Sequence, residues 1–405
     1  MTEKTAKKAS MKKFQKPNRF FYTIYMILAR ILLKLFLKTE YDYSGFEELK
    51  RNGGPALVVS PHVSNLDFLF AGVALSPNHV TFVGSHHFMT NPTTRRFLSK
   101  AHAIPKKMFC ADVSTIISIM RAKEAGQIIV IYPEGRLTCA GHSLSVTEGT
   151  AELVKKLGIS VYCIKQDGSY KSIPKWSKFK IRPGKVLVHG FRVFTAEQTK
   201  QLPIYEINEG LEKAILHDEE KVLTDIRYRC KETAVGLNGL LYRCPECGSL
   251  YEMKAEGCRI FCESCGAEWT LDEKYVLHGK TMSSINEWYD WQEDEIDLDL
   301  GIDSEVKVGT PDESGNMDKN AGYGHLKVNR DEISFKGEVH GKPLEFTEST
   351  SVITAFPASV NDHISMYSNR ILYYFYPEPD RIVTMSWVQY LDKLTKERKK
   401  HKNIV

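Results

Sequence analysis

The stretch "ALVVSPHVSNLDFLF", residues 56–70, joins an apolar run to a turn and to the start of a helical pattern. The run "ALVVS" predicts a buried strand, and "NLDFLFAGVAL" after it predicts a helix over 65–75. The same alternation continues along the chain, with strands expected at 79–85, 128–132 and 159–164 and helices at 90–101, 113–126 and 149–158. Continuous apolar strands that alternate with amphipathic helices indicate an α/β domain with a mostly parallel sheet.

The length of 405 residues and the apolar content of 42% allow two or three packed domains. Charge is uneven, since seven of the first nineteen residues are Lys or Arg, whereas 287–305 contains acidic residues and no Lys or Arg. We therefore expect a disordered basic arm at 1–18, a helix at 19–38, the α/β domain at 39–225, a cysteine-containing unit at 240–272, an acidic linker helix at 283–300 and a β-rich domain at 301–400.

The last of these units shows short alternating patterns separated by Asn, Gly, Pro or Asp. Strands are predicted at 324–329, 331–337, 343–348, 351–356, 363–368 and 371–377, followed by a helix at 380–400. This order of strands and a final helix resembles a pleckstrin-homology-like or GRAM-like module. Such modules often bind lipids or proteins, but a fold alone does not establish a ligand.

The segment at 19–38, "RFFYTIYMILARILLKLFLK", is nearly as long as the roughly 20 residues that cross a bilayer. Arg30, Lys34 and Lys38 recur at four-residue steps and so lie along one face of a helix. A charge at the bilayer centre costs at least ~2.5 kcal/mol, which favours a helix lying in the membrane interface. The basic arm would add attraction to anionic lipids. The alternative is an amphipathic helix that packs on its own domain. The proposed lipid-facing side contains Phe20, Ile24, Ile27, Leu28, Ile31 and Leu35.

Two polar stretches follow predicted strands. His62 and Asp67 lie five residues apart after the first strand, and "PEGRLT", residues 133–138, follows a later one. Asp67 has an ordinary explanation as a carboxylate in the first turn of a helix. The alternative is a catalytic pair in which Asp67 orients His62 as a general base. Loops at the carboxyl ends of parallel strands meet at one edge of the sheet, so both stretches could face one site.

Together these stretches resemble the motifs of the glycerophospholipid acyltransferase family, which includes the lysophosphatidic acid acyltransferases. The likeness covers roughly residues 40–200. It implies that His62 removes the proton of an acceptor hydroxyl while Asp67 orients the imidazole. It also implies that Gly135 and Arg136 hold the acceptor phosphate and that Glu134 positions the acceptor or the loop.

The reaction implied is acyl transfer from acyl-CoA or acyl carrier protein to the free hydroxyl of a lysophospholipid, in phospholipid biosynthesis. The favoured acceptor is 1-acylglycerol-3-phosphate. The expected location is the cytoplasmic face of a membrane, as a peripheral or monotopic protein that contacts anionic lipids.

The sequence departs from the family pattern in several places, and two of them concern the site. Arg136 follows Gly135 directly, which looks closer to the acylglycerophosphoethanolamine acyltransferase subgroup and leaves the head group open. The arginine expected after "AHAIP" is missing, with Met108 near its place and Lys106 or Lys107 as the remaining cations. These departures keep an alternative open, namely a non-catalytic lipid-binding or scaffold protein with a degenerate acyltransferase domain.

Four cysteines occur in two matching pairs, "CPECG" and "CESCG". No signal peptide is expected, so a reducing cytoplasm favours metal binding over disulfides. Two Cys-x-x-Cys pairs, each followed by Gly, are typical of a structural zinc ribbon in which four thiolates hold Zn²⁺. The expected ligands are Cys244, Cys247, Cys262 and Cys265. The intervening hairpin is not strongly basic, so no nucleic-acid partner is expected.

Overall fold

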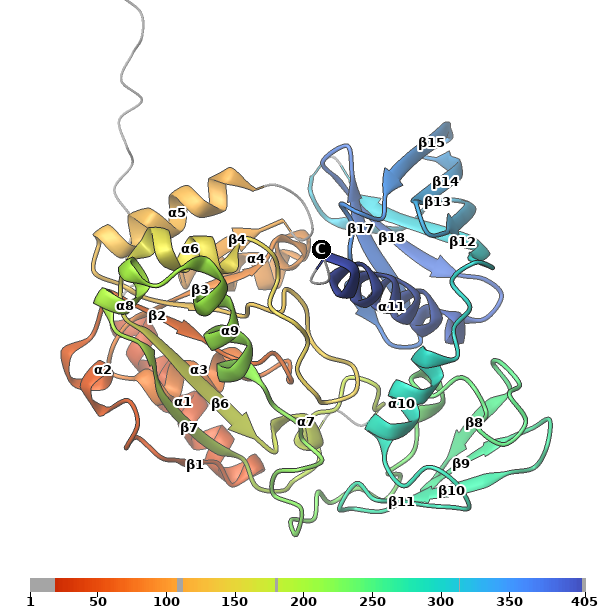
Figure 1. Ribbon diagram of the computed structural model, residues 1–405, viewed down its shortest axis with the longest axis horizontal. Coiled ribbons are helices and arrows are strands. Elements are labelled where there is room, and N and C mark those ends of the chain that lie inside the picture. Colours follow the sequence, from red (N-terminus) through yellow and green to blue (C-terminus); the bar gives the residue numbers. More distant parts are fainter. Residues whose placement is uncertain (1–18, 108–111, 179–180, 313, 403–405) are drawn as a thin grey trace, which may run out of the picture.

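The structure, a computed structural model, describes residues 19–107, 112–178, 181–312 and 314–402 (Figure 1). The basic arm expected at 1–18 and the position of Met108 lie outside the described residues. The chain forms an α/β unit, a small antiparallel sheet, and a larger antiparallel sheet followed by the last helix. This arrangement confirms the fold class that the sequence predicts.

The first sheet is mixed and mostly parallel, with strand order β1-β7-β6-β2-β5-β3-β4. The five strands from β6 to β4 run parallel, and β7 runs antiparallel to its neighbour β6. The strands are β1 (Glu40–Tyr41), β2 (Ala56–Val59), β3 (Val80–Ser85), β4 (Ile104–Lys106), β5 (Ile128–Ile131), β6 (Val161–Asp167) and β7 (Leu187–Phe194).

Helices cover both faces of this sheet because successive side chains of each strand point to opposite faces. On β2, Val58 packs in one apolar cluster with α1 (Arg19–Leu37) and α3 (Asp67–Leu75). Its neighbours Leu57 and Val59 pack in a second cluster. That second cluster includes residues of α5 (Val113–Glu124), α6 (Thr150–Leu157) and α9 (Ile204–Ile215). The shorter helices are α2 (Glu47–Asn52), α4 (Pro92–Lys100), α7 (Ser169–Ser172) and α8 (Ala196–Gln201).

Helix α1 has two apolar faces rather than one. One face is buried against the α/β unit and contains Tyr22, Met26, Ala29, Leu33 and Leu37. The other is exposed and contains Phe20, Phe21, Ile24, Ile27, Leu28, Ile31, Leu32, Leu35 and Phe36. Helix α1 therefore packs on its own domain, as one of the two sequence interpretations expects. It also keeps an exposed apolar face, which the other interpretation, a helix in the membrane interface, requires.

The small sheet has the order β11-β10-β9-β8. Cys244 and Cys247 lie in the segment before its first strand, and Cys262 and Cys265 lie at the end of its second strand and in the turn that follows. Its strands are β8 (Met253–Glu256), β9 (Arg259–Cys262), β10 (Glu268–Leu271) and β11 (Leu277–His278), and α10 (Ile285–Asp294) follows. The larger sheet has the order β15-β14-β13-β12-β18-β17-β16, and α11 (Thr384–Lys402) follows it. Its strands are β12 (Ile302–Pro311), β13 (Met317–Val328), β14 (Glu332–Val339), β15 (Lys342–Ser349), β16 (Ala358–Ser359), β17 (His363–Ser368) and β18 (Ile371–Pro377).

One strand prediction is wrong, because residues 351–356 form a loop and no strand. The chain turns directly after β15, where the Val352 N–H donates to the Ser349 carbonyl. Ile353 and Phe356 are nevertheless buried in the core. The apolar residues that predicted a strand therefore pack from an irregular segment.

A single apolar cluster joins the three units. It contains Val63, next to His62, and Cys139 and Ala140 from the α/β unit. It also contains Trp269 of the small sheet and Leu391 of α11. The C-terminal parts of the chain therefore pack directly against the loops that carry the predicted site.

Candidate functional site

The two polar stretches leave neighbouring strands at the same edge of the sheet. Strands β2 and β5 are parallel, and Val59 pairs with Ile131 at their carboxyl ends. His62 follows the first strand and residues 133–138, the PEGR loop, follow the second. The sheet therefore brings together the residues that the sequence proposes for one site.

His62 and Asp67 form a hydrogen-bonded pair, with 2.9 Å between Nδ1 of His62 and Oδ2 of Asp67. The same carboxylate oxygen accepts the backbone N–H groups of Val63 and Ser64, because Asp67 begins α3 directly after the turn. Asp67 is completely buried, whereas the His62 side chain is 28% exposed. Burial raises the pKa of Asp67, and the hydrogen bonds from His62 and the two amides oppose that shift. With Nδ1 bound, Nε2 of His62 is the nitrogen left for a substrate.

Tyr132 is a site residue that the sequence reasoning missed. Its ring stacks on the imidazole of His62, with 4.2 Å between ring centroids and 24° between planes. Burial raises the pKa of Tyr132, and the nearby charge of Asp67 adds to that shift. The ring therefore restricts the imidazole from one side. The sequence signal that could have identified Tyr132 is its position directly before "PEG", at the end of the strand that leads to the site.

Glu134 joins the two loops by its carboxylate. Oε1 accepts the backbone N–H of His62 at 2.7 Å, and Oε2 accepts the backbone N–H of Leu144 at 2.7 Å. Burial raises the pKa of Glu134 to about 7, although both hydrogen bonds act in the opposite direction. Glu134 is thus engaged with the backbone of the site, and Gly135 after it adopts a φ of 77° that favours glycine.

Arg136 is buried, and its guanidinium pairs with the carboxylate of Asp392 in α11. Burial alone would lower the pKa of Arg136, but Asp392 together with Cys139 and Tyr289 outweighs that effect and raises it. Lys175 lies close to this pair, and burial lowers its pKa. Binding of an acceptor phosphate by Arg136 stays a prediction, and it would require Asp392 to be displaced.

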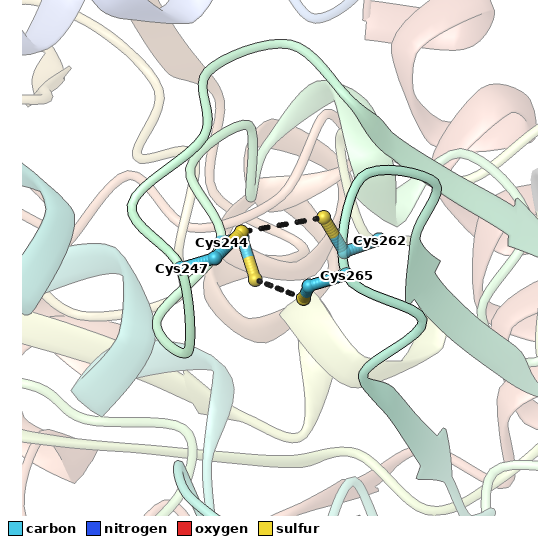
Figure 2. Close-up of side chains that lie close together, drawn as sticks. All are labelled: Cys244, Cys247, Cys262 and Cys265. Atoms are coloured by element: carbon cyan, nitrogen blue, oxygen red, sulfur yellow. Dashed lines mark hydrogen bonds between the residues drawn. The ribbon is translucent and has the colours of Figure 1, made fainter.

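The four cysteines expected to bind metal lie together at the ends of two facing loops, which Figure 2 shows. All four Sγ atoms lie within 4.8 Å of one another. The Sγ atoms of Cys244 and Cys265 are 3.7 Å apart, and those of Cys247 and Cys262 are 3.8 Å apart. The loops are alike, since Gly248 N–H donates to Cys244 O and Gly266 N–H to Cys262 O. This arrangement suits a metal ion, and we call it the cysteine cluster.

Comparison with known proteins finds a similarity in the first unit. Residues 41–165 match a family model described as Acyltransferase. A search of curated proteins gave no significant match. The crystal structure of the 1-acyl-sn-glycerophosphate (LPA) acyltransferase PlsC from Thermotoga maritima is similar over 48% of this chain and 80% of that chain, with 18% sequence identity and a TM-score of 0.38. At that level the structural match supports no inference about substrate.

Replacing Glu134 by Gln tests the role of its carboxylate in the site. An amide offers one acceptor oxygen in place of two, so either His62 or Leu144 loses the acceptor of its N–H group. A buried donor without a partner costs about 1–3 kcal/mol. We expect a lower midpoint of urea denaturation for Glu134→Gln. Glu209→Gln on the exposed face of α9 is the matched control, and an equal shift in both variants would contradict the interpretation.

Proposed function

We propose that this chain, whose residues 41–165 form an acyltransferase domain, transfers a fatty acyl group from a thioester donor to the free hydroxyl of a lysophospholipid. The observation that carries the proposal is the His62–Asp67 pair, which lies at the carboxyl edge of the sheet inside the matched region. The acceptor that we favour is 1-acylglycerol-3-phosphate, and the donor is acyl-CoA or acyl carrier protein.

The proposed mechanism uses His62 first as a base and then as an acid. Asp67 accepts the Nδ1–H of His62, which directs the lone pair of Nε2 toward the acceptor. Nε2 takes the proton of the acceptor hydroxyl as its oxygen attacks the thioester carbonyl. The tetrahedral intermediate then expels the thiolate, which receives that proton from the imidazolium. The acyl group moves directly to the acceptor, so no serine or cysteine nucleophile is needed.

Replacing His62 by Ala should abolish most of the transfer. General-base assistance contributes about 10² to 10⁴ in rate, so we expect a loss of at least that lower value. The measurement is transfer of a labelled acyl group to a panel of lysolipids, with both donor types. His325→Ala, at an exposed histidine of the C-terminal sheet, is the control and should retain full turnover. A His62→Ala protein that kept more than about a tenth of wild-type turnover would contradict the mechanism.

The alternative of a non-catalytic lipid-binding protein has one observation in its favour. The guanidinium predicted to hold the phosphate is already paired with Asp392. In that case the wild-type protein would bind lysolipid in the same panel and transfer no acyl group. The assay therefore separates the two functions.

We further propose that the cysteine cluster holds one structural zinc ion. With Zn–S bonds of about 2.3 Å, a tetrahedral site places its sulfur atoms about 3.8 Å apart. Two of the sulfur pairs lie at 3.7 and 3.8 Å, and all four atoms lie within 4.8 Å of one another, which supports this geometry. Four thiolates fill a tetrahedral site, so the ion would stabilise the small sheet and leave no position for a substrate.

Replacing Cys244 by Ser should remove most of the bound zinc and lower the thermal stability of the protein. Metal analysis of the purified full chain should give one zinc per chain for the wild type. Cys258→Ser is the matched control, because Cys258 is exposed and lies outside the cluster. Zinc-free native protein would refute the site. Loss of acyl transfer on chelation, in protein that stays folded, would refute a purely structural role.

The exposed face of α1 supports a membrane-binding role. By length and composition, α1 is an apolar helix that could cross a membrane over Phe20–Leu37. Its other face is nevertheless part of the core of the α/β unit. A contiguous exposed apolar patch of this kind is typical of an interaction surface. We propose that it lies in the interface of a membrane with anionic lipids, on the cytoplasmic face, and presents the site to lipid substrates.

Replacing Ile27, Leu28, Ile31 and Leu35 together by Ser should weaken vesicle binding and leave the fold intact, since all four side chains are exposed. Fully burying one such side chain contributes about 1.5–3 kcal/mol, so we expect at least a tenfold loss of binding. The measurement is cosedimentation with phosphatidylcholine–phosphatidylglycerol vesicles. The control is Leu300→Ser with Val352→Ser, two exposed residues elsewhere. Unchanged binding by the α1 variant would contradict the interfacial role.

A further inference from the structure

The backbone of His62 is held on both sides by the PEGR loop. Its N–H donates to Oε1 of Glu134 at 2.7 Å, and its carbonyl accepts the N–H of Thr138 at 2.9 Å. Both partners belong to the same six-residue segment after β5. The position of the imidazole therefore depends on the conformation of this loop.

Arg136 lies between those two partners in sequence and connects the loop to α11. Its side chain is 6% exposed and that of Asp392, its ion-pair partner, is 11% exposed. Removing one partner of a buried ion pair leaves the other charge without compensation, which is strongly destabilising. The charge of Asp392 therefore restricts where the PEGR loop can lie.

Helix α11 is itself firmly placed. Gln389 donates to the carbonyl of Tyr289 in α10 at 2.7 Å and accepts from Gln292 at 2.9 Å. Lys396 pairs with Glu293 of α10 at 2.5 Å. Leu391, next to Asp392, is completely buried in the cluster that also contains Val63. Asp392 is thus presented to the PEGR loop from a helix that is held by several contacts.

We propose that Asp392 is a positioning residue of the acyltransferase site, which acts through Arg136 to hold the PEGR loop and with it His62. The C-terminal helix is then part of the apparatus that orients the base. It is not a separable attachment. An effect of Asp392 on the rate of acyl transfer rests on the proposed function, whereas its effect on the conformation of the PEGR loop does not.

A competing interpretation makes Asp392 a substitute for the acceptor phosphate. Arg136 and Lys175 are two cations beside one carboxylate, and the acceptors of Lys175 Nζ are distant, with Leu137 O at 3.4 Å and Cys139 Sγ at 3.6 Å. In that interpretation, removing the charge of Asp392 frees the site for phosphate. The two interpretations predict opposite kinetic effects.

The experiment compares Asp392→Asn, Asp392→Glu and Glu378→Gln in the full chain. Glu378→Gln is the control, because it also removes a carboxylate that pairs with an arginine, Arg381 at 2.9 Å, and Glu378 follows β18, outside α10, α11 and the PEGR loop. Hydrogen exchange of residues 60–67 and 133–138 is measured by mass spectrometry. Acyl transfer is measured as kcat and as KM for 1-acylglycerol-3-phosphate.

For Asp392→Asn we expect at least tenfold faster exchange of both segments, since the opening of the loop becomes easier. We expect kcat to fall about 10–100-fold with KM within about twofold, because the base is misplaced while binding persists. Asp392→Glu keeps the charge, so its exchange rates and its kcat should stay close to those of the wild type. Glu378→Gln should change neither the exchange of these two segments nor kcat.

Two results would overturn the proposal. A lower KM with a higher kcat/KM in Asp392→Asn would make Asp392 a competitor of the acceptor phosphate. Equal effects of Asp392→Asn and Glu378→Gln would show that the Arg136–Asp392 pair contributes only to the general stability of the fold. If the wild-type chain transfers no acyl group, hydrogen exchange still tests whether Asp392 holds the PEGR loop in place. Failure of the proposed function can therefore be told apart from failure of the positioning role.

Discussion

The parallel pairing of β2 with β5 is the constraint on which the rest of the site depends. Because Val59 pairs with Ile131, the chain leaves both strands at one level of the sheet edge, and the loops that follow start side by side. The carboxylate of Glu134 can then accept the backbone N–H of His62, after β2, and that of Leu144, further along its own loop. A slip of one residue would turn the side chains of one strand to the other face and separate these groups.

Contacts between residues close in sequence could be predicted from the sequence. The five-residue spacing of His62 and Asp67 places the carboxylate in the first turn of α3, from which it reaches back to the imidazole. The two cysteine pairs lie on similar tight turns, so the Cys-x-x-Cys spacing alone indicates that both thiols of a pair lie on the same side of their turn. In both cases local backbone geometry determines the contact, although the catalytic role of His62 stays a prediction.

Contacts between distant parts of the chain could not be predicted in this way. Arg136 and Asp392 are 256 residues apart, and nothing in the local pattern of either segment identifies the other. The two faces of α1 pose a similar problem, because a helix that is apolar nearly all round can bury either face in protein or in lipid. Only the position of the sheet decides which residues, such as Met26, become core.

The burial of Arg136 also limits where an acceptor phosphate can bind in the proposed reaction. A phosphate in place of the Asp392 carboxylate would still compensate the guanidinium, but the displaced carboxylate would need a new partner. The backbone of Asp392 is held in place, because the adjacent Leu391 is buried in the core. Exchange would therefore either turn the Asp392 side chain away and leave its carboxylate without this partner, or move α11 and break its hydrogen bonds to α10. A phosphate bound beside the exposed part of the His62 side chain avoids that cost, and Arg136 can then stay paired with Asp392 and hold the loop that orients the base.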